Sequence, residues 1–155
     1  MTLRALELKV PPVAVFVLCG AAAFGLRELA PTLGHEASWA SAVALLLGGI
    51  GVGIAVLGVI RFVRVGTTVH PTHPSRASRV VRTGIYRLSR NPMYLGLALL
   101  LAALATWLSH PLPFLVVPAF VLYMNRFQIR PEERALLEKF GEPYAEYRTA
   151  VRRWI

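Results

Sequence analysis

The chain has 155 residues, of which 55% are hydrophobic and only 16% are charged, and its formal net charge is +9. Apolar content this high exceeds what a soluble domain needs and is concentrated in blocks, so the composition predicts an integral membrane protein. The basic residues lie between the apolar blocks, as the positive-inside rule requires, and no basic helix or aromatic-interleaved strand accompanies them, which argues against nucleic-acid binding.

The first apolar block, residues 10–26, has no charged residue and is about as long as the shortest helix that crosses a bilayer. The single cysteine, Cys19, lies inside it and is interpreted as a small buried hydrophobic residue. A cleaved signal peptide is an alternative interpretation, disfavoured because the apolar run continues to Leu26. The polar connection at 27–38 then predicts a non-cytoplasmic loop.

The second apolar block, residues 39–60, is also free of charge and is rich in glycine. Small residues recur four apart in it, which permits close contact between helices in lipid. We interpret this as packing against the first block within one molecule; a homodimer is the alternative, and the sequence does not favour it. Neither block contains an Asp, Glu, Lys, Arg or His for a proton relay or a histidine-ligated haem, which argues against a transporter or a cytochrome.

A polar loop follows at residues 61–92, with seven arginines and no acidic residue. The positive-inside rule places this loop in the cytosol, and with Arg4 and Lys9 the N-terminus falls on the same side. Histidines at positions 70 and 73 suggest a metal site, but no cysteine or carboxylate within the loop completes a ligand set, so no metal is predicted.

The third and fourth apolar blocks, residues 93–108 and 112–124, are shorter. At about 1.5 Å per residue, neither alone comfortably spans a core about 30 Å thick. The fourth block reaches that length if its helix continues into residues 125–128. The short uncharged turn at 109–111 predicts an antiparallel hairpin, both ends of which return to the cytosolic side.

The charged tail, residues 125–155, has helical spacing, with Gly141 as a helix stop and a further short helix after Pro143. The sequence as a whole predicts an all-α integral membrane bundle: a single domain, 1–155, with four transmembrane helices and a cytosolic C-terminal helical segment. Both termini and the long loop then lie in the cytosol. This topology gathers the polar candidate residues on one face.

Two motifs occur on that face. Residues 84–87 read GIYR and residues 89–96 read SRNPMYLG, and a Glu132-Glu133 pair follows with Tyr144 and Tyr147 beyond it. In this order and spacing the motifs resemble the isoprenylcysteine carboxyl methyltransferase family and its phospholipid N-methyltransferase relatives, over about residues 65–155. The resemblance implies a membrane enzyme that uses S-adenosylmethionine and releases S-adenosylhomocysteine. The cofactor-binding positions that it implies are Gly84, Tyr86, Arg90, Asn91, Pro92, Tyr94, Gly96, Leu97, Glu132 and Glu133.

The residue types suit that cofactor, which presents a carboxylate, an ammonium, a ribose diol, an adenine ring and a sulfonium. Arg90 can pair with the carboxylate through two parallel hydrogen bonds. Glu132 or Glu133 can accept hydrogen bonds from the ammonium or the ribose. Tyr86 or Tyr94 can face the adenine or the sulfonium.

The acceptor is expected to be a lipophilic small molecule or a lipid that enters from the membrane. A carboxylate or thiolate acceptor needs no base, whereas a protonated amine must first lose a proton, and Glu133 or Glu132 is then the best available base. Arg126 or Arg130 would orient an anionic acceptor. The alternative from another functional class is a non-catalytic membrane scaffold or accessory subunit that keeps the fold.

Two positions of the first motif carry further expectations. Gly96, two residues beyond Tyr94, would let a ligand approach the helix backbone closely. Asn91 occupies a position at which the commoner family pattern has histidine. Asparagine donates a hydrogen bond but does not titrate.

Overall fold

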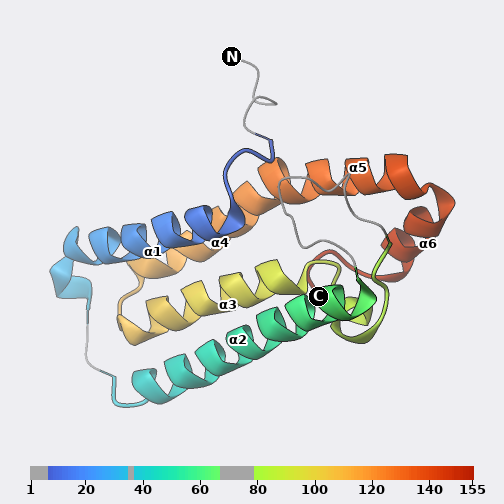
Figure 1. Ribbon diagram of the computed structural model, residues 1–155. Coiled ribbons are helices and arrows are strands. Elements are labelled where there is room, and N and C mark those ends of the chain that lie inside the picture. The colour runs from blue at the N-terminus through green and yellow to red at the C-terminus, as the bar shows by residue number, and fades with distance from the viewer. Residues whose placement is uncertain (1–6, 35–36, 67–78) are drawn as a thin grey trace.

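The computed structural model describes residues 7–34, 37–66 and 79–155, and every regular element in these ranges is helical (Figure 1). The predicted all-α class is therefore confirmed. The histidines at positions 70 and 73 lie outside the described residues. The helices are α1 (Pro12–Glu28), α2 (Ala40–Val65), α3 (Pro92–Trp107), α4 (Val116–Tyr123), α5 (Arg130–Phe140) and α6 (Glu142–Ala150), with 3₁₀ turns at Pro31–Leu33, Gly84–Arg87 and Leu112–Leu115 and a π-helical turn at Met124–Ile129.

Among the residues that the structure describes, two helices are long and apolar enough to cross a membrane. They are α2, with a mean hydropathy of 2.6, and the continuous helical run Leu112–Phe140, with a mean hydropathy of 1.4. The outer face of α2 carries large apolar side chains that are largely exposed, such as Leu45 at 79% and Val63 at 67%. An apolar face this extensive suits lipid rather than water. A bilayer crossing by α1 and α3 stays a prediction.

The observed helices extend beyond two of the predicted spans. α2 continues past Ile60 through Arg61 and Arg64, because arginine side chains do not interrupt backbone hydrogen bonding. It ends at Gly66, whose φ of 67° and N–H bonds to the Phe62 and Val63 carbonyls form a left-handed cap. The fourth span likewise continues through the π-helical turn into α5, which ends at Gly141 as predicted.

The small residues of α2 pack against α3, not against α1 as the sequence analysis expected. A Cβ atom built on Gly51 would lie 2.9 Å from the Gly96 carbonyl oxygen, and one built on Gly96 would lie 2.5 Å from the Gly51 carbonyl oxygen. Near the end of α2, a Cβ on Gly58 would lie 2.9 Å from the Met93 side chain. The glycines therefore let two backbones approach directly, which holds the start of α3 beside the end of α2.

We expect Gly96→Ala to destabilise the protein by about 1–3 kcal/mol, because the added methyl group must displace the backbone of α2. Gly53→Ala is the matched control, since a Cβ at Gly53 meets nothing within 4 Å. Thermal unfolding in detergent compares the two variants. Equal melting temperatures would show that the α2–α3 contact is looser than described.

The connection between α3 and α4 is a tight turn fixed by His110. Its Nδ1 accepts a hydrogen bond from the Leu112 N–H at 3.2 Å, so its Nε2 carries the proton and donates to the Ala30 carbonyl at 2.9 Å. α4 then runs back along α3, which confirms the predicted hairpin (Figure 1). Four parts of the chain therefore lie together at one end of the bundle: the start of α1, the end of α2, the start of α3 and the helical segment after α4.

Candidate functional site

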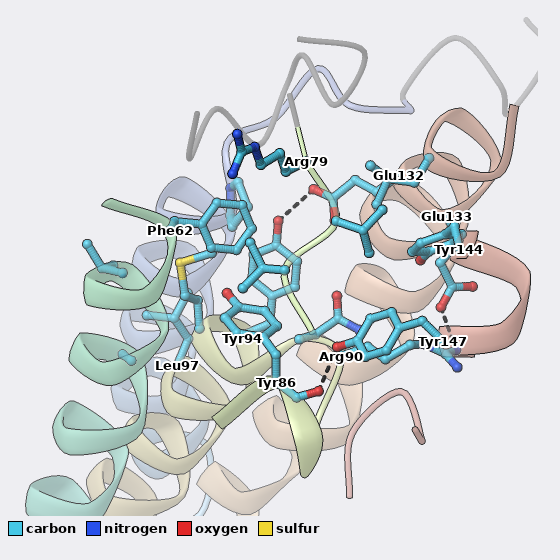
Figure 2. A pocket seen from close by; sticks show the side chains of 18 of the residues that line it. Phe62, Arg79, Tyr86, Arg90, Tyr94, Leu97, Glu132, Glu133, Tyr144 and Tyr147 are labelled. Carbon is cyan, nitrogen blue, oxygen red and sulfur yellow. Dashed lines mark hydrogen bonds and ion pairs between the residues drawn. The ribbon is translucent and has the colours of Figure 1, made fainter. Parts of the chain in front are cut away.

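A cavity of about 460 Å³ lies at that end of the bundle. Its walls come from the segment before α1, the ends of α2 and α3 that meet there, the loop before α3, and α5 and α6 (Figure 2). The two sequence motifs thus contribute to one site, although residues 97–131 separate them in the sequence. The lining residues are Pro11, Pro12, Val13, Ala55, Val59, Phe62, Arg79, Val80, Val81, Tyr86, Arg90, Asn91, Met93, Tyr94, Leu97, Glu132, Glu133, Leu136, Tyr144 and Tyr147.

Aromatic side chains form one side of the cavity. Tyr86 lies in the 3₁₀ turn Gly84–Arg87 and meets Phe62 edge to face, with ring centroids 5.3 Å apart. Its carbonyl accepts a hydrogen bond from Tyr147 Oη at 2.7 Å, which joins the loop before α3 to α6 (Figure 2). Burial raises the pKa of Tyr86 and of Tyr147, so both phenols stay protonated at neutral pH.

An ion cluster closes the opposite side. Glu133 Oε1 accepts from Arg90 Nη2 at 2.7 Å and from Arg153 Nε at 3.1 Å, and its Oε2 accepts from Arg153 Nη2 at 2.6 Å. The side chains of Glu133 and Arg90 are only 9% and 10% exposed. Both carboxylate oxygens of Glu133 are therefore engaged by arginine. Two guanidinium groups and one carboxylate leave the cluster with one net positive charge.

Arg90 is also tied to the C-terminal segment. Its Nη1 donates to the carbonyls of Val151, at 2.7 Å, and of Arg148, while its backbone N–H donates to the Arg152 carbonyl at 3.0 Å. Its Nε is buried without a hydrogen-bond partner in the part of the chain that the structure describes. The guanidinium expected to bind a cofactor carboxylate is thus largely occupied by the protein itself, and its Nε is the nitrogen left without a partner in the described part of the chain.

Glu132, the neighbour of Glu133, has a different environment. Its Oε1 accepts from Tyr94 Oη at 2.7 Å (Figure 2). The same oxygen also accepts from Gln128 Nε2 at 2.6 Å. No arginine pairs with it among the described residues, and both recorded hydrogen bonds end on the same oxygen. Glu132 is therefore a carboxylate that is held in place and still has an oxygen to offer to the cavity that it lines.

Asn91 binds the tail of the chain. Its Nδ2 donates to the Arg153 carbonyl at 3.0 Å, and its N–H donates to Ser89 Oγ at 3.1 Å. Trp154 continues the attachment through a hydrogen bond of 3.1 Å from its Nε1 to Asn125 Oδ1. The Asn91 side chain thus positions the C-terminal segment that supplies Arg153. This contact needs a hydrogen-bond donor and does not need a titratable group.

The remaining positions of the first motif divide into two groups. Leu97 lines the cavity, whereas Gly84, Pro92 and Gly96 do not. Gly84 has a φ of 65° and lies against the Arg61 guanidinium, where a side chain would not fit. The expectation that Gly96 admits a ligand is corrected, because the backbone of α2 occupies that space.

The two arginines proposed to orient an anionic acceptor lie away from the cavity lining. Arg126 pairs with Glu7 at 2.7 Å, and Arg130 is exposed. Sequence reasoning also missed Phe62 and Arg153. Phe62 lies in an arginine-rich stretch that was interpreted as loop, and no spacing rule connects Arg153 to Glu133 across 20 residues.

Known proteins are similar to this chain over much of its length. A family model described as phospholipid methyltransferase matches residues 39–143, which is more than half of the chain. Over 63 residues the chain is 48% identical to an uncharacterized protein of Haemophilus influenzae, covering 41% of this chain and 100% of that protein.

Two longer relatives are named as methyltransferases. A protein-S-isoprenylcysteine O-methyltransferase of Saccharomyces cerevisiae is 40% identical over 73 residues, covering 46% of this chain and 30% of that protein. A probable protein-S-isoprenylcysteine O-methyltransferase of Oryza sativa subsp. indica is 33% identical over 114 residues, covering 72% of this chain and 58% of that protein. The chain therefore spans only part of the length of these two relatives. No solved structure matches the chain significantly.

Proposed function

The chain belongs to the phospholipid methyltransferase family, and from this premise we propose that it transfers the methyl group of S-adenosylmethionine to a lipophilic or amphiphilic acceptor at the cytosolic face of a membrane. The observation that carries the proposal is the single cavity that joins Tyr86, Arg90 and Tyr94 of the first motif to the Glu132-Glu133 pair of the second. Aromatic walls, a net positive cluster and a separate carboxylate occur together there.

The residues present fit S-adenosylmethionine. The positive charge shared by Arg90, Glu133 and Arg153 suits the cofactor's carboxylate. Buried polar atoms normally have a partner, and Arg90 Nε and Tyr86 Oη, which have none among the described residues, are two groups that a ligand could satisfy. Glu132 is suited to the ammonium or the ribose diol. The bound cofactor would supply an activated methyl group on a positively charged sulfur.

The geometry favours Glu132 over Glu133 where a base is needed. A proton acceptor must offer a lone pair to the reacting group, and both oxygens of Glu133 already accept from guanidinium groups. Glu132 has its orientation set by Tyr94 and Gln128 on one oxygen only. An amine acceptor would therefore give its proton to Glu132, whereas a carboxylate or thiolate acceptor would need none.

Positioning and exclusion of water supply the rest of the catalysis, because displacement at a sulfonium methyl requires alignment of the nucleophile, the carbon and the sulfur. Apolar lining residues such as Val13, Val59 and Leu97 suit the lipophilic part of an acceptor. We place α1, α2, α3 and the helical run Leu112–Phe140 across the bilayer. The cavity then lies at the cytosolic face, because the arginines at the end of α2 and in the turn Gly84–Arg87 are at the cavity end of the bundle.

The test uses the protein purified in detergent. We expect S-adenosylhomocysteine to bind with one-to-one stoichiometry in calorimetry. Membranes that contain the protein should also transfer tritium from methyl-labelled S-adenosylmethionine to a fraction that organic solvent extracts. A non-catalytic scaffold would give neither signal. Absence of both, with correctly folded protein, would overturn the proposal.

A further inference from the structure

The segment that precedes α1 is fastened to the helical run that carries the glutamate pair. Glu7 Oε1 accepts from Arg126 Nη1 at 2.7 Å, and its Oε2 accepts from Arg134 Nη2. The Glu7 side chain is only 12% exposed, although it lies near the beginning of the chain. The hydrogen bond from Arg126 lowers the pKa of Glu7, so the carboxylate is charged at neutral pH.

The backbone beside Glu7 makes a second attachment. The Leu8 N–H donates to the Phe127 carbonyl at 3.0 Å, within the π-helical turn Met124–Ile129. Leu8 has a φ of 59°, a conformation that a bulky residue adopts only where surrounding contacts impose it. Two independent contacts therefore dictate where this segment lies, beside the start of α5 (Figure 1).

The same segment leads directly into a wall of the cavity. Pro11, Pro12 and Val13 line it, and Val13 is also 62% exposed to the surroundings, which places Val13 at the mouth. Val10, between the attachment and these residues, packs against the main apolar core. The contacts of Glu7 thus hold the N-terminal end of this wall, and the packing of Val10 against the apolar core holds the part that follows.

We propose that Glu7 is a positioning residue: its pairs with Arg126 and Arg134 hold residues 7–13 as the wall against which the lipophilic part of the acceptor binds. This inference rests on the proposed methyl transfer and deepens it. Glu7 does not line the cavity itself. Its removal should therefore weaken the binding of the acceptor and leave the cofactor pockets around Arg90 and Glu132 intact.

The test compares Glu7→Gln with Glu138→Gln, an exposed glutamate of α5 that has no ion pair among the described residues. The probes are N-acetyl-S-farnesylcysteine and dioleoylphosphatidylethanolamine presented in phosphatidylcholine vesicles, and the kinetics use whichever one the wild-type protein methylates. We expect Glu7→Gln to raise the KM for that acceptor by about tenfold, with the Kd for S-adenosylhomocysteine unchanged. Arg126→Gln leaves the pair of Glu7 with Arg134 and should raise the KM less, and the double variant should be no worse than Glu7→Gln alone.

Hydrogen exchange provides a readout that does not depend on turnover. Exchange at the amides of residues 8–13 should accelerate in Glu7→Gln and not in Glu138→Gln. Unchanged exchange, or an unchanged acceptor KM, would overturn the inference while the proposed function stands. A wild-type protein that binds no S-adenosylhomocysteine and methylates neither probe would refute the proposed function, and the inference would fail with it.

Discussion

Replacing Arg90 by alanine is expected to abolish S-adenosylhomocysteine binding and to destabilise the protein by about 3–5 kcal/mol. Arg90 joins the start of α3 to α5 and to the C-terminal segment through Glu133 and the carbonyls of Arg148 and Val151. Its loss would leave a buried carboxylate with Arg153 as its one remaining ion-pair partner and would strip two carbonyls of a donor. The wall that carries the positive charge of the site would then separate from α3.

Calorimetry with S-adenosylhomocysteine and thermal unfolding in detergent measure both effects. Arg87→Ala is the matched control, because Arg87 is exposed and lies three residues earlier in the same loop. Arg90→Lys is a second variant that keeps the charge and loses the planar fork, so it should fold better than the alanine variant and still bind the product weakly. Wild-type affinity in Arg90→Ala would mean that the ion cluster is not part of the cofactor site.

Glu132→Gln is expected to lower the rate of methyl transfer by about a hundredfold or more while the fold is kept. Glutamine has the same shape and can still accept from Tyr94, so the change removes only the proton-accepting oxygen. The expected loss is larger than that for a surface carboxylate, because Glu132 faces the cavity and has no arginine partner among the described residues.

The cofactor and acceptor roles of Glu132 can be separated by two measurements on this variant. A higher Kd for S-adenosylhomocysteine would assign the Glu132 side chain to binding the ammonium or the ribose of the cofactor. An unchanged Kd with a reduced kcat would assign it to proton transfer from an amine. Tyr94→Phe removes one hydrogen bond to the same oxygen and should have a smaller effect, about tenfold. A rate within experimental error of wild type in Glu132→Gln would remove this residue from the mechanism.

The sequence predicted much of the scaffold because local rules govern it. Apolar blocks free of charge predicted the helices, Gly141 predicted the end of α5, and the short uncharged turn before α4 predicted the hairpin. Prediction from the sequence failed where a local rule is compatible with more than one packing arrangement. Glycines that allow close packing do not specify a partner, and α2 packs on α3 rather than on α1.

The candidate site was likewise predicted only in part from the sequence. The motifs identified Arg90, Tyr94 and the glutamate pair as members of one site, and the cavity contains all of them. The partner of each of these side chains depends on the direction in which the side chain leaves the helix, because consecutive residues of a helix point about 100° apart. Glu133 therefore meets Arg90 and Arg153, while Glu132 meets Tyr94 and Gln128.

Hydropathy and spacing are local properties of the chain, so the class of fold, the two motifs and the chemical types gathered at one end of the bundle could be predicted from the sequence. Which charges are paired and which remain available depends on the tertiary structure. Contacts such as Glu7 with Arg126, 119 residues apart, form because the helices bring distant segments together, and no local pattern encodes that distance. Arg126 thereby pairs with the segment that leads into the cavity wall, and Glu132 becomes the acidic side chain that faces the cavity without an arginine partner among the described residues.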